Sequence, residues 1–268
     1  DEPACLGVPP YISPYIRTVT GALLSHGYSP RYLTIDQVRK DARLISAMDA
    51  SELVLMIAGV TVPGKYLGGT PASLTEIRQI GAQLRRPETF LAGPIGFGYA
   101  SGGGRKAVKG EIAGFDHLLS GSPASALDVF LREGKTHGTH DYRREDPWAI
   151  AGASVIRDHP HFPWVMCEIE TARGCSRAHS GGCSFCTEPF YGLPVFRSVD
   201  GIAGEVESLY AAGARHFRIG RQPDILVYGS SMAEEYPTPV PERIDELFSL
   251  IREAAPGLHT LHIDNVNP

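Results

Sequence analysis

Three cysteines that could bind metal lie within twelve positions of the chain, at Cys175, Cys183 and Cys186. Seven residues separate the first two and two residues separate the last pair, and the segment follows an apolar stretch typical of a buried strand. Thiolates are soft ligands that select Zn²⁺ or the iron of iron–sulfur clusters. Three thiolates leave one metal position open, and an open iron can bind a substrate or a cofactor. The spacing therefore indicates a metal centre with access for a small molecule.

His179 lies between the first two cysteines and keeps two alternatives open. Together with all three thiols it gives a Cys-x3-His-x3-Cys-x2-Cys spacing that suits a closed, structural zinc site. Such a site would make the chain a zinc-stabilised binding module without catalysis. Alternatively, His179 replaces Cys175 as the first ligand of an iron centre. The remaining cysteines, Cys5 and Cys167, are expected to be buried as small apolar side chains.

The composition is that of an ordinary globular protein and excludes several classes. Of the 268 residues, 43% are hydrophobic and 21% are charged, which excludes disordered, collagen-like and coiled-coil chains. The longest apolar run, Leu53 to Val60, is far too short to span a bilayer, and no N-terminal signal peptide is present. A net charge of −5 argues against a dominant nucleic-acid-binding surface. Five cysteines, three of them clustered, make a poor disulfide framework and indicate a protein of the reducing cytoplasm.

Apolar periodicity divides residues 1–134 into alternating helices and short strands. A Ser13–Pro14 start predicts a helix that Gly27 ends, and a capping box of Ser73 and Glu76 predicts another. The other predicted elements are strands at 31–35, 53–58, 89–92 and 115–119, a weaker helix through Val38 and Leu44, and a helix from Pro123 to about Gly134. This alternation predicts a Rossmann-like, doubly wound parallel sheet. Because such a sheet normally has a strand before its first helix, we expect residues to be missing ahead of Asp1.

The next stretch is polar with little periodicity and is predicted to be an interdomain linker over 135–160. It and the two residues that follow carry five potential metal ligands, which we expect to be exposed rather than to form a site: His137, His140, Asp141, His159 and His161. A second βα series starts near residue 161. Its strands are predicted at 165–170, 216–220 and 258–263, and its helices at 199–212 and from Pro241 onward. The chain is therefore expected to consist of two α/β parts.

The motif around the cysteines resembles that of the radical S-adenosylmethionine superfamily. A strand that ends in Arg173-Gly174-Cys175, followed by Cys183-Ser184-Phe185-Cys186, is similar to the superfamily's C-x3-C-x2-C loop, with four additional residues between the first two cysteines. Segments 1–5 and 181–188 further resemble an uncharacterised archaeal group of iron–sulfur oxidoreductases. By this resemblance, residues 161–268 form the first half of a TIM-like (βα)6 radical barrel, preceded by a flavodoxin-like, cobalamin-binding-like domain. Members of the group typically end in a helix-hairpin-helix, which would favour nucleic acid, so a nucleic-acid partner stays open.

The resemblance also implies cofactors and partners. Cys175, Cys183 and Cys186 would ligate three irons of a [4Fe–4S] cluster, whose fourth iron would bind the amine and carboxylate of S-adenosylmethionine. Reduction by a ferredoxin or flavodoxin would then yield a 5′-deoxyadenosyl radical, which abstracts hydrogen from a substrate that the sequence does not identify. Because the superfamily places its first cysteine directly after the strand, Cys175 is favoured over His179 as the first ligand.

Two further contacts with S-adenosylmethionine are implied by the resemblance. Phe185 would pack near the adenine. The turn Gly220-Arg221-Gln222 would hold the methionine amine, although it lacks the acidic residue of the superfamily's Gly-Gly-Glu-like turn. Because only three of the six expected barrel strands are present, we expect this chain to cleave S-adenosylmethionine poorly or not at all.

The N-terminal domain is expected to keep its fold without binding cobalamin, and cobalamin is the less favoured alternative. No histidine has an aspartate two positions before it, so the Asp-x-His-x-x-Gly motif of base-off cobalamin domains is absent. The glycine-rich run Gly93–Gly98 is similar to a phosphate-binding turn, but no helix is predicted directly after it, and a tight loop is favoured. The cations Arg105 and Lys106 follow three glycines in what we expect to be a mobile loop.

Overall fold

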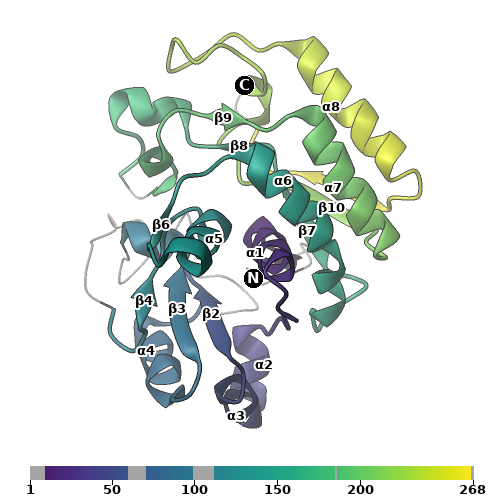
Figure 1. The fold of residues 1–268 in the computed structure, drawn as a ribbon. Coiled ribbons are helices and arrows are strands. Elements are labelled where there is room, and N and C mark those ends of the chain that lie inside the picture. The colour runs from purple at the N-terminus through teal and green to yellow at the C-terminus, as the bar shows by residue number, and fades with distance from the viewer. Residues whose placement is uncertain (1–9, 60–70, 99–111, 185, 267–268) are drawn as a thin grey trace.

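The computed structural model describes residues 10–59, 71–98, 112–184 and 186–266, which form an α/β fold with two main parallel sheets (Figure 1). Cys5, Phe185 and the loop with Arg105 and Lys106 lie outside the described residues. The larger sheet has the order β1 (Tyr11–Ile12), β7 (Met166–Glu170), β10 (His216–Gly220) and β11 (Thr260–Ile263). The second has the order β2 (Leu53–Ile57), β3 (Glu88–Ala92) and β4 (His117–Leu118). Two short pairs complete the strands: β5 (Ser120–Gly121) with β6 (His137–Gly138), and β8 (Ala172–Arg173) with β9 (Val195–Phe196).

Several predicted helices are confirmed together with their caps. The Ser13 side chain accepts a hydrogen bond from the Tyr15 amide and starts α1 (Pro14–Ser25). Ser73 and Glu76 form the predicted capping box of α4 (Leu74–Gln83). The other helices are α2 (Ile35–Lys40), α3 (Arg43–Asp49), α5 (Pro123–Glu133), α6 (Tyr142–Ala151), α7 (Val199–Ala211) and α8 (Pro241–Ala254). Short side-chain-to-backbone caps explain why the starts of α1 and α4 were readable from the sequence.

The predicted strand at 31–35 is wrong. Thr34 instead caps α2: its hydroxyl accepts from the Gln37 amide at 3.2 Å, and the Gln37 side chain accepts from the Thr34 amide at 2.8 Å. The weaker helix predicted through Val38 and Leu44 is two short helices, because the backbone is extended at Asp41. The local capping box therefore outweighs the apolar pattern that suggested a strand.

A strand does precede the first helix, contrary to our expectation that this strand is missing. Tyr11 and Ile12 form β1, which pairs in parallel with Met166 and Cys167 of β7. The strand therefore joins the sheet of the second half of the chain and not the sheet of the first half. The helix that follows, α1, lies between the two sheets (Figure 1).

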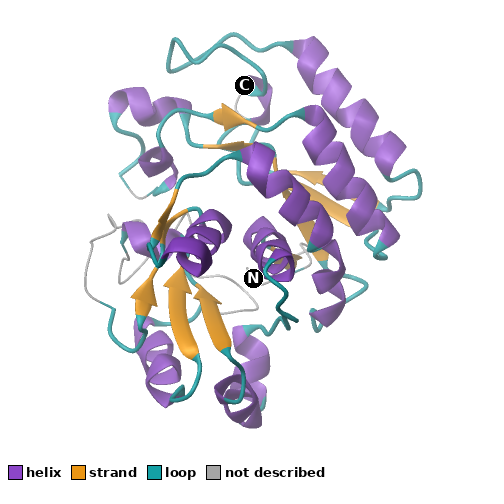
Figure 2. Ribbon diagram, viewed as in Figure 1, coloured by secondary structure: helices purple, strands orange, loops and turns teal. Residues whose placement is uncertain are grey.

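Helix α1 contributes to both main hydrophobic cores. Ile16 packs in the core around β7 and β10, whereas Val19 and Ala22 pack in the core around β3 and α5. In the larger sheet, alternate residues such as Cys167, Ile169 and Phe217 share one hydrophobic core with residues of helices α7 and α8, and helices pack along this sheet (Figure 2). The confirmed burial of Cys167 agrees with its predicted role as a small apolar side chain.

The segment 135–160 is not the irregular stretch that its composition suggested. Asp141 caps α6, and a 3₁₀ helix follows at Ala153–Asp158. A Cβ atom at Gly21 of α1 would lie 2.0 Å from the Trp148 carbonyl oxygen of α6, so glycine permits these two helices to pack closely. Helix α6 was missed because its sequence is polar and carries Pro147 in its interior. A division of the chain into domains at 134 and 160 stays a prediction.

His159, expected to be exposed, is 4% exposed, and burial lowers its pKa to about 4. Because an unfolded histidine titrates near pH 6.5, the unfolded chain binds this proton first as the pH falls. We expect the free energy of unfolding to decrease by roughly 2–3 kcal/mol between about pH 6.5 and pH 4 on account of this group alone. Urea titrations across that range should show that the free energy of unfolding depends less steeply on pH in His159→Gln than in the parent chain. In the control variant His137→Gln, which replaces an exposed histidine, the slope of this dependence should equal that of the parent chain. Equal slopes for the two variants would contradict the prediction.

No helix in the described part of the chain is both long and apolar enough to cross a membrane.

Candidate functional site

The three cysteines lie on a loop whose two ends are fastened together. We call residues 174–192 the cysteine loop. It runs from β8 to β9, which pair in antiparallel fashion, and the Cys175 amide donates to the Gly192 carbonyl at 3.0 Å. Gly174 has a φ of 101°, and a Cβ atom there would lie 2.6 Å from the Gly192 oxygen, so only glycine fits this closure. The Gly174 amide also donates to the Glu188 carboxylate at 3.0 Å.

The thiols of Cys175, Cys183 and Cys186 are all free and lie on this one loop. Cys175 is buried and the other two are half-buried. Burial raises the pKa of Cys175 and that of Cys186, and the Cys183 thiol and the Glu188 carboxylate raise both further. The structure thus places the three predicted ligands on one fastened loop beside a carboxylate.

Two of these sulfurs also accept an N–H hydrogen bond. The Glu188 amide donates to Cys186 Sγ at 3.4 Å, and the Arg177 guanidinium donates to Cys183 Sγ at 3.4 Å. N–H donors of this kind stabilise thiolates, the form in which cysteine binds metal.

The two metal chemistries that the sequence left open differ in how close together their ligands must stand. Across the described residues, no three or more His, Cys, Asp or Glu side chains are placed to hold a single metal ion. A single zinc needs all four donors within about 2.0–2.3 Å of one point. Thiolates of a cluster bind different irons and therefore stand further apart. His179, the fourth donor of the zinc alternative, lies with its Nε2 3.0 Å from the Met232 carbonyl oxygen, so nothing in the described geometry favours that alternative.

The predicted turn at the end of β10 contains a strained arginine and a buried amide without partners. Arg221 has a φ of 57°, a conformation that non-glycine residues adopt rarely and mostly at functional sites. Its guanidinium donates to the Tyr15 hydroxyl at 2.7 Å and lies 3.6 Å from the Glu188 carboxylate. Gln222 is 3% exposed, and neither Nε2 nor Oε1 has a hydrogen-bond partner among the described residues. The turn therefore touches the cysteine loop and has one donor and one acceptor to offer.

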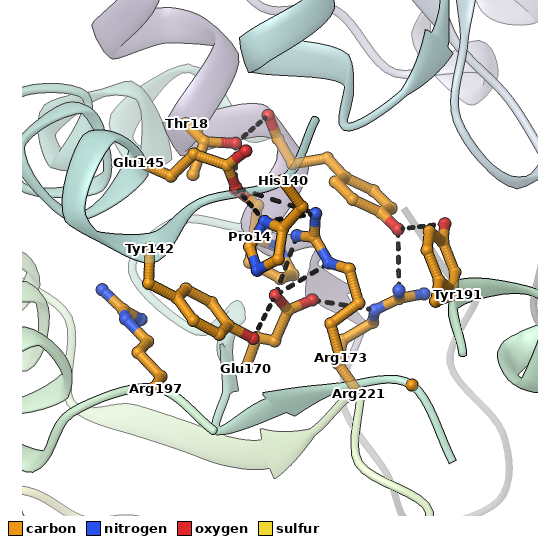
Figure 3. Close-up of polar contacts among 12 residues, drawn as sticks. Pro14, Thr18, His140, Tyr142, Glu145, Glu170, Arg173, Tyr191, Arg197 and Arg221 are labelled. Carbon is orange, nitrogen blue, oxygen red and sulfur yellow. Dashed lines mark hydrogen bonds and ion pairs between the residues drawn. The ribbon is translucent and has the colours of Figure 1, made fainter. Parts of the chain in front are cut away.

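A buried polar network connects this turn to the N-terminal half (Figure 3). Its centre is Glu170, at the end of β7, which accepts from the Tyr142 hydroxyl at 2.9 Å and from Arg173 at 2.8 Å and lies 3.4 Å from Arg221. Burial alone would raise the pKa of Glu170, but Arg173 and Arg221 outweigh it and hold the pKa at about 2. The carboxylate is therefore ionised at neutral pH and holds both arginines in place.

The sequence did not reveal this network, although it contained one signal. Glu168 and Glu170 are charged residues of the buried strand β7, which is unusual in a parallel sheet, and Arg173 follows in β8. Tyr191 of the cysteine loop joins the network through its hydroxyl, which lies 2.9 Å from that of Tyr15. The residues that surround the predicted site are thus contributed by α1, α6, β7, β8 and the cysteine loop.

The glycines at the edge of the smaller sheet are explained by backbone packing. A Cβ atom at Gly59 would lie 2.3 Å from the Ile95 nitrogen, and one at Gly93 would lie 2.7 Å from the Ala58 oxygen. The Ile95 amide donates to the Ala58 carbonyl at 3.1 Å. This geometry agrees with the tight loop that was favoured over a phosphate-binding turn. Phe97 of the same loop packs edge-on against Tyr191, with ring centroids 4.6 Å apart, so the two halves meet at the cysteine loop.

Comparison with curated proteins finds two archaeal relatives, and no family model matches the chain. An uncharacterized protein of Archaeoglobus fulgidus is 40% identical over 268 residues, which is all of this chain and 47% of that protein. One of Methanocaldococcus jannaschii is 41% identical over 281 aligned residues, which is all of this chain and 51% of that protein. The chain therefore spans about half the length of the curated relatives it matches.

Comparison with solved structures relates the fold to a radical S-adenosylmethionine methyltransferase, TsrM from Kitasatospora setae. Its structure with tryptophan and the analogue aza-SAM matches 93% of this chain and 50% of that chain, with a TM-score of 0.57 and 17% identity. A second structure of TsrM, with cobalamin and a [4Fe–4S] cluster bound, gives a TM-score of 0.56 and 16% identity. The fold of this chain is thus one that occurs in the radical S-adenosylmethionine superfamily, to which the cysteine motif had pointed independently.

Proposed function

We propose that this chain carries the cofactor site of a radical S-adenosylmethionine enzyme, in which Cys175, Cys183 and Cys186 hold a [4Fe–4S] cluster. The observation that carries the proposal is the group of three free thiols on one fastened loop, two of them with an N–H donor to the sulfur. Three thiolates match the ligand chemistry of such a cluster and leave its fourth iron to a small molecule. The similarity in fold to TsrM supports the same assignment.

The turn at Gly220-Arg221-Gln222 fits the amino-acid end of S-adenosylmethionine in a way the sequence did not foresee. The superfamily's acidic residue is absent here, but the unpartnered amide of Gln222 offers Nε2 to a carboxylate and Oε1 to an ammonium group. Arg221 lies beside the cysteine loop, and its charge opposes the rise in the pKa of Cys186 that burial causes. In this proposal Gln222 orients the methionine end, and Phe185 keeps its predicted place near the adenine.

The proposed chemistry needs one external electron. When bound and reduced by a low-potential carrier such as a ferredoxin or flavodoxin, the cluster supplies the electron that splits the sulfonium C–S bond of S-adenosylmethionine into methionine and a 5′-deoxyadenosyl radical. Glu170 remains ionised throughout and keeps Arg173 and Arg221 in position. Cobalamin is left out of the proposal because the chain lacks the Asp-x-His-x-x-Gly motif of base-off cobalamin domains.

Anaerobic reconstitution with iron and sulfide, followed by electron paramagnetic resonance, tests the proposal. We expect about four irons and four sulfides per chain and, after reduction, the signal of a [4Fe–4S] cluster. Addition of S-adenosylmethionine should change that signal, since the cofactor binds the open iron. Uptake of zinc in place of iron, or a cluster signal that S-adenosylmethionine leaves unchanged, would contradict the proposal.

The identity of the first ligand gives a separate prediction. We expect His179→Ala to retain the cluster, because the His179 ring contacts the Met232 carbonyl and the ligand set does not need it. Cys175→Ala should lose most of the iron, since this residue provides one of three thiolates. Iron and sulfide analysis after identical reconstitution measures both. Iron retained by Cys175→Ala and lost by His179→Ala would assign the first position to the histidine.

A further inference from the structure

One residue of the cysteine loop, Arg177, places a charged side chain on one of the three thiols. It lies in the short 3₁₀ helix Ser176–Ser180, within the longer segment that separates Cys175 from Cys183. Its guanidinium donates to Cys183 Sγ at 3.4 Å. The N–H donor that the described residues offer to Cys186 Sγ is a backbone amide, that of Glu188. Of the N–H donors that contact these sulfurs in the described part of the chain, the Arg177 guanidinium is therefore the one that carries a charge.

The guanidinium is held in place by a neighbouring segment. Arg177 lies over the ring of Tyr236, at 6.0 Å from its centroid. Two further contacts fasten the same short helix to residues 232–236: His179 Nε2 lies 3.0 Å from the Met232 carbonyl oxygen, and the Ser180 hydroxyl donates to Glu235 at 3.0 Å. Three contacts with this one segment thus support the position of the cation beside Cys183, which does not depend on a single contact.

We propose that Arg177 sets the reduction potential of the cluster by hydrogen-bonding to the sulfur of Cys183. This inference rests on the proposed function. Reduction adds one electron, and hence one negative charge, to the cluster. A cation and an N–H donor at a ligand sulfur stabilise that added charge, and hydrogen bonds to the sulfurs together with the net charge are known determinants of cluster potential. Arg177 should therefore make the cluster easier to reduce. The carboxylates of Glu188 and Glu235, which also face this loop, act in the opposite direction and are unchanged in the test.

The test compares the potentials of reconstituted Arg177→Gln, Arg177→Lys and the parent chain. Each is titrated with dithionite without S-adenosylmethionine, and the reduced fraction is followed by electron paramagnetic resonance. We expect Arg177→Gln to lower the reduction equilibrium constant by roughly threefold to tenfold, or about 30–60 mV at 59 mV per decade for one electron. Arg177→Lys keeps the positive charge but lacks the planar set of guanidinium N–H donors. Its reduction potential should therefore lie between those of Arg177→Gln and the parent chain. Arg252→Gln, an exposed arginine of α8, gives the same change in net charge and should leave the potential unchanged.

The outcomes separate this inference from the proposed function. If the parent chain takes up no cluster, the proposed function fails first. If all variants carry a full cluster and Arg177→Gln has the parent potential, the inference is wrong and the cluster assignment stands. If Arg177→Gln does not retain a cluster, the potential of Arg177→Lys is compared with that of the parent instead. An Arg177→Lys potential equal to that of the parent would show that Arg177 serves cluster assembly and would overturn the proposed tuning role. A lowered Arg177→Lys potential supports the tuning role.

Discussion

Cys183→Ala is expected to abolish iron and sulfide uptake almost completely, together with the broad absorbance near 400 nm (roughly, as for thiolate-ligated iron clusters). Removal of this thiolate leaves two protein ligands, and Arg177 then faces no sulfur at this position. Metal content and the visible spectrum after anaerobic reconstitution measure the effect. This is the largest change we expect from any single substitution at the site.

Cys167→Ala is the matched control for that experiment. Cys167 is also a free thiol, but it is fully buried in β7, and burial raises its pKa to about 12. The substitution removes one sulfur atom from the core and should cost stability without loss of iron. If Cys167→Ala loses as much iron as Cys183→Ala, the loss reflects unfolding. If Cys183→Ala retains its iron, the assignment of the ligands is wrong.

Glu205→Gln is expected to destabilise the folded chain by about 3–5 kcal/mol, because it leaves two buried arginines without their shared carboxylate. Glu205 of α7 is fully buried and accepts from Arg17 Nε of α1 at 2.6 Å, and its second oxygen pairs with Arg197. Burial would raise the pKa of Glu205, but the two arginines outweigh it and lower the pKa below its ordinary value. The stabilisation is therefore complete at neutral pH and is lost only as the pH falls below the pKa of the unfolded carboxyl.

Denaturant titration at neutral pH measures this effect, and Glu207→Gln is the control. Glu207 lies two residues further along the same helix and is exposed. Its substitution should change the free energy of unfolding by no more than about 0.5 kcal/mol. A change below about 1 kcal/mol for Glu205→Gln would show that the two arginines find other partners or water.

Local signals explain what the sequence predicted correctly. The starts of α1 and α4 depend on contacts between residues two or three positions apart, such as Ser73 with Glu76. The bounds of β10 were predicted as they are found, because the alternation of apolar Phe217 and Ile219 with polar residues is again a local pattern. The three thiols could be selected as ligands because their spacing was visible in the sequence.

Features that depend on distant partners could not be predicted in this way. The two residues of β1 become a strand only because Met166 and Cys167 are available to pair with them. The Arg221 guanidinium contacts the hydroxyl of Tyr15, 206 positions away. The unpartnered amide of Gln222 is a property of its surroundings and not of its neighbours in sequence. The structure therefore added two kinds of information about the site: which of its side chains are buried, and which distant residues they contact.

The position of α1 between the two hydrophobic cores has a consequence for folding energetics. Ile16 belongs to one core and Val19 to the other, and Arg17 of the same helical turn donates to the Glu168 carbonyl of β7. Neither core can lose α1 without exposing apolar surface and leaving a buried charge unpaired. The two halves are therefore expected to melt as one cooperative unit, with a calorimetric enthalpy equal to the van 't Hoff enthalpy. A ligand bound at the cysteine loop would then raise the melting temperature of the smaller sheet as well, by mass action through the shared helix.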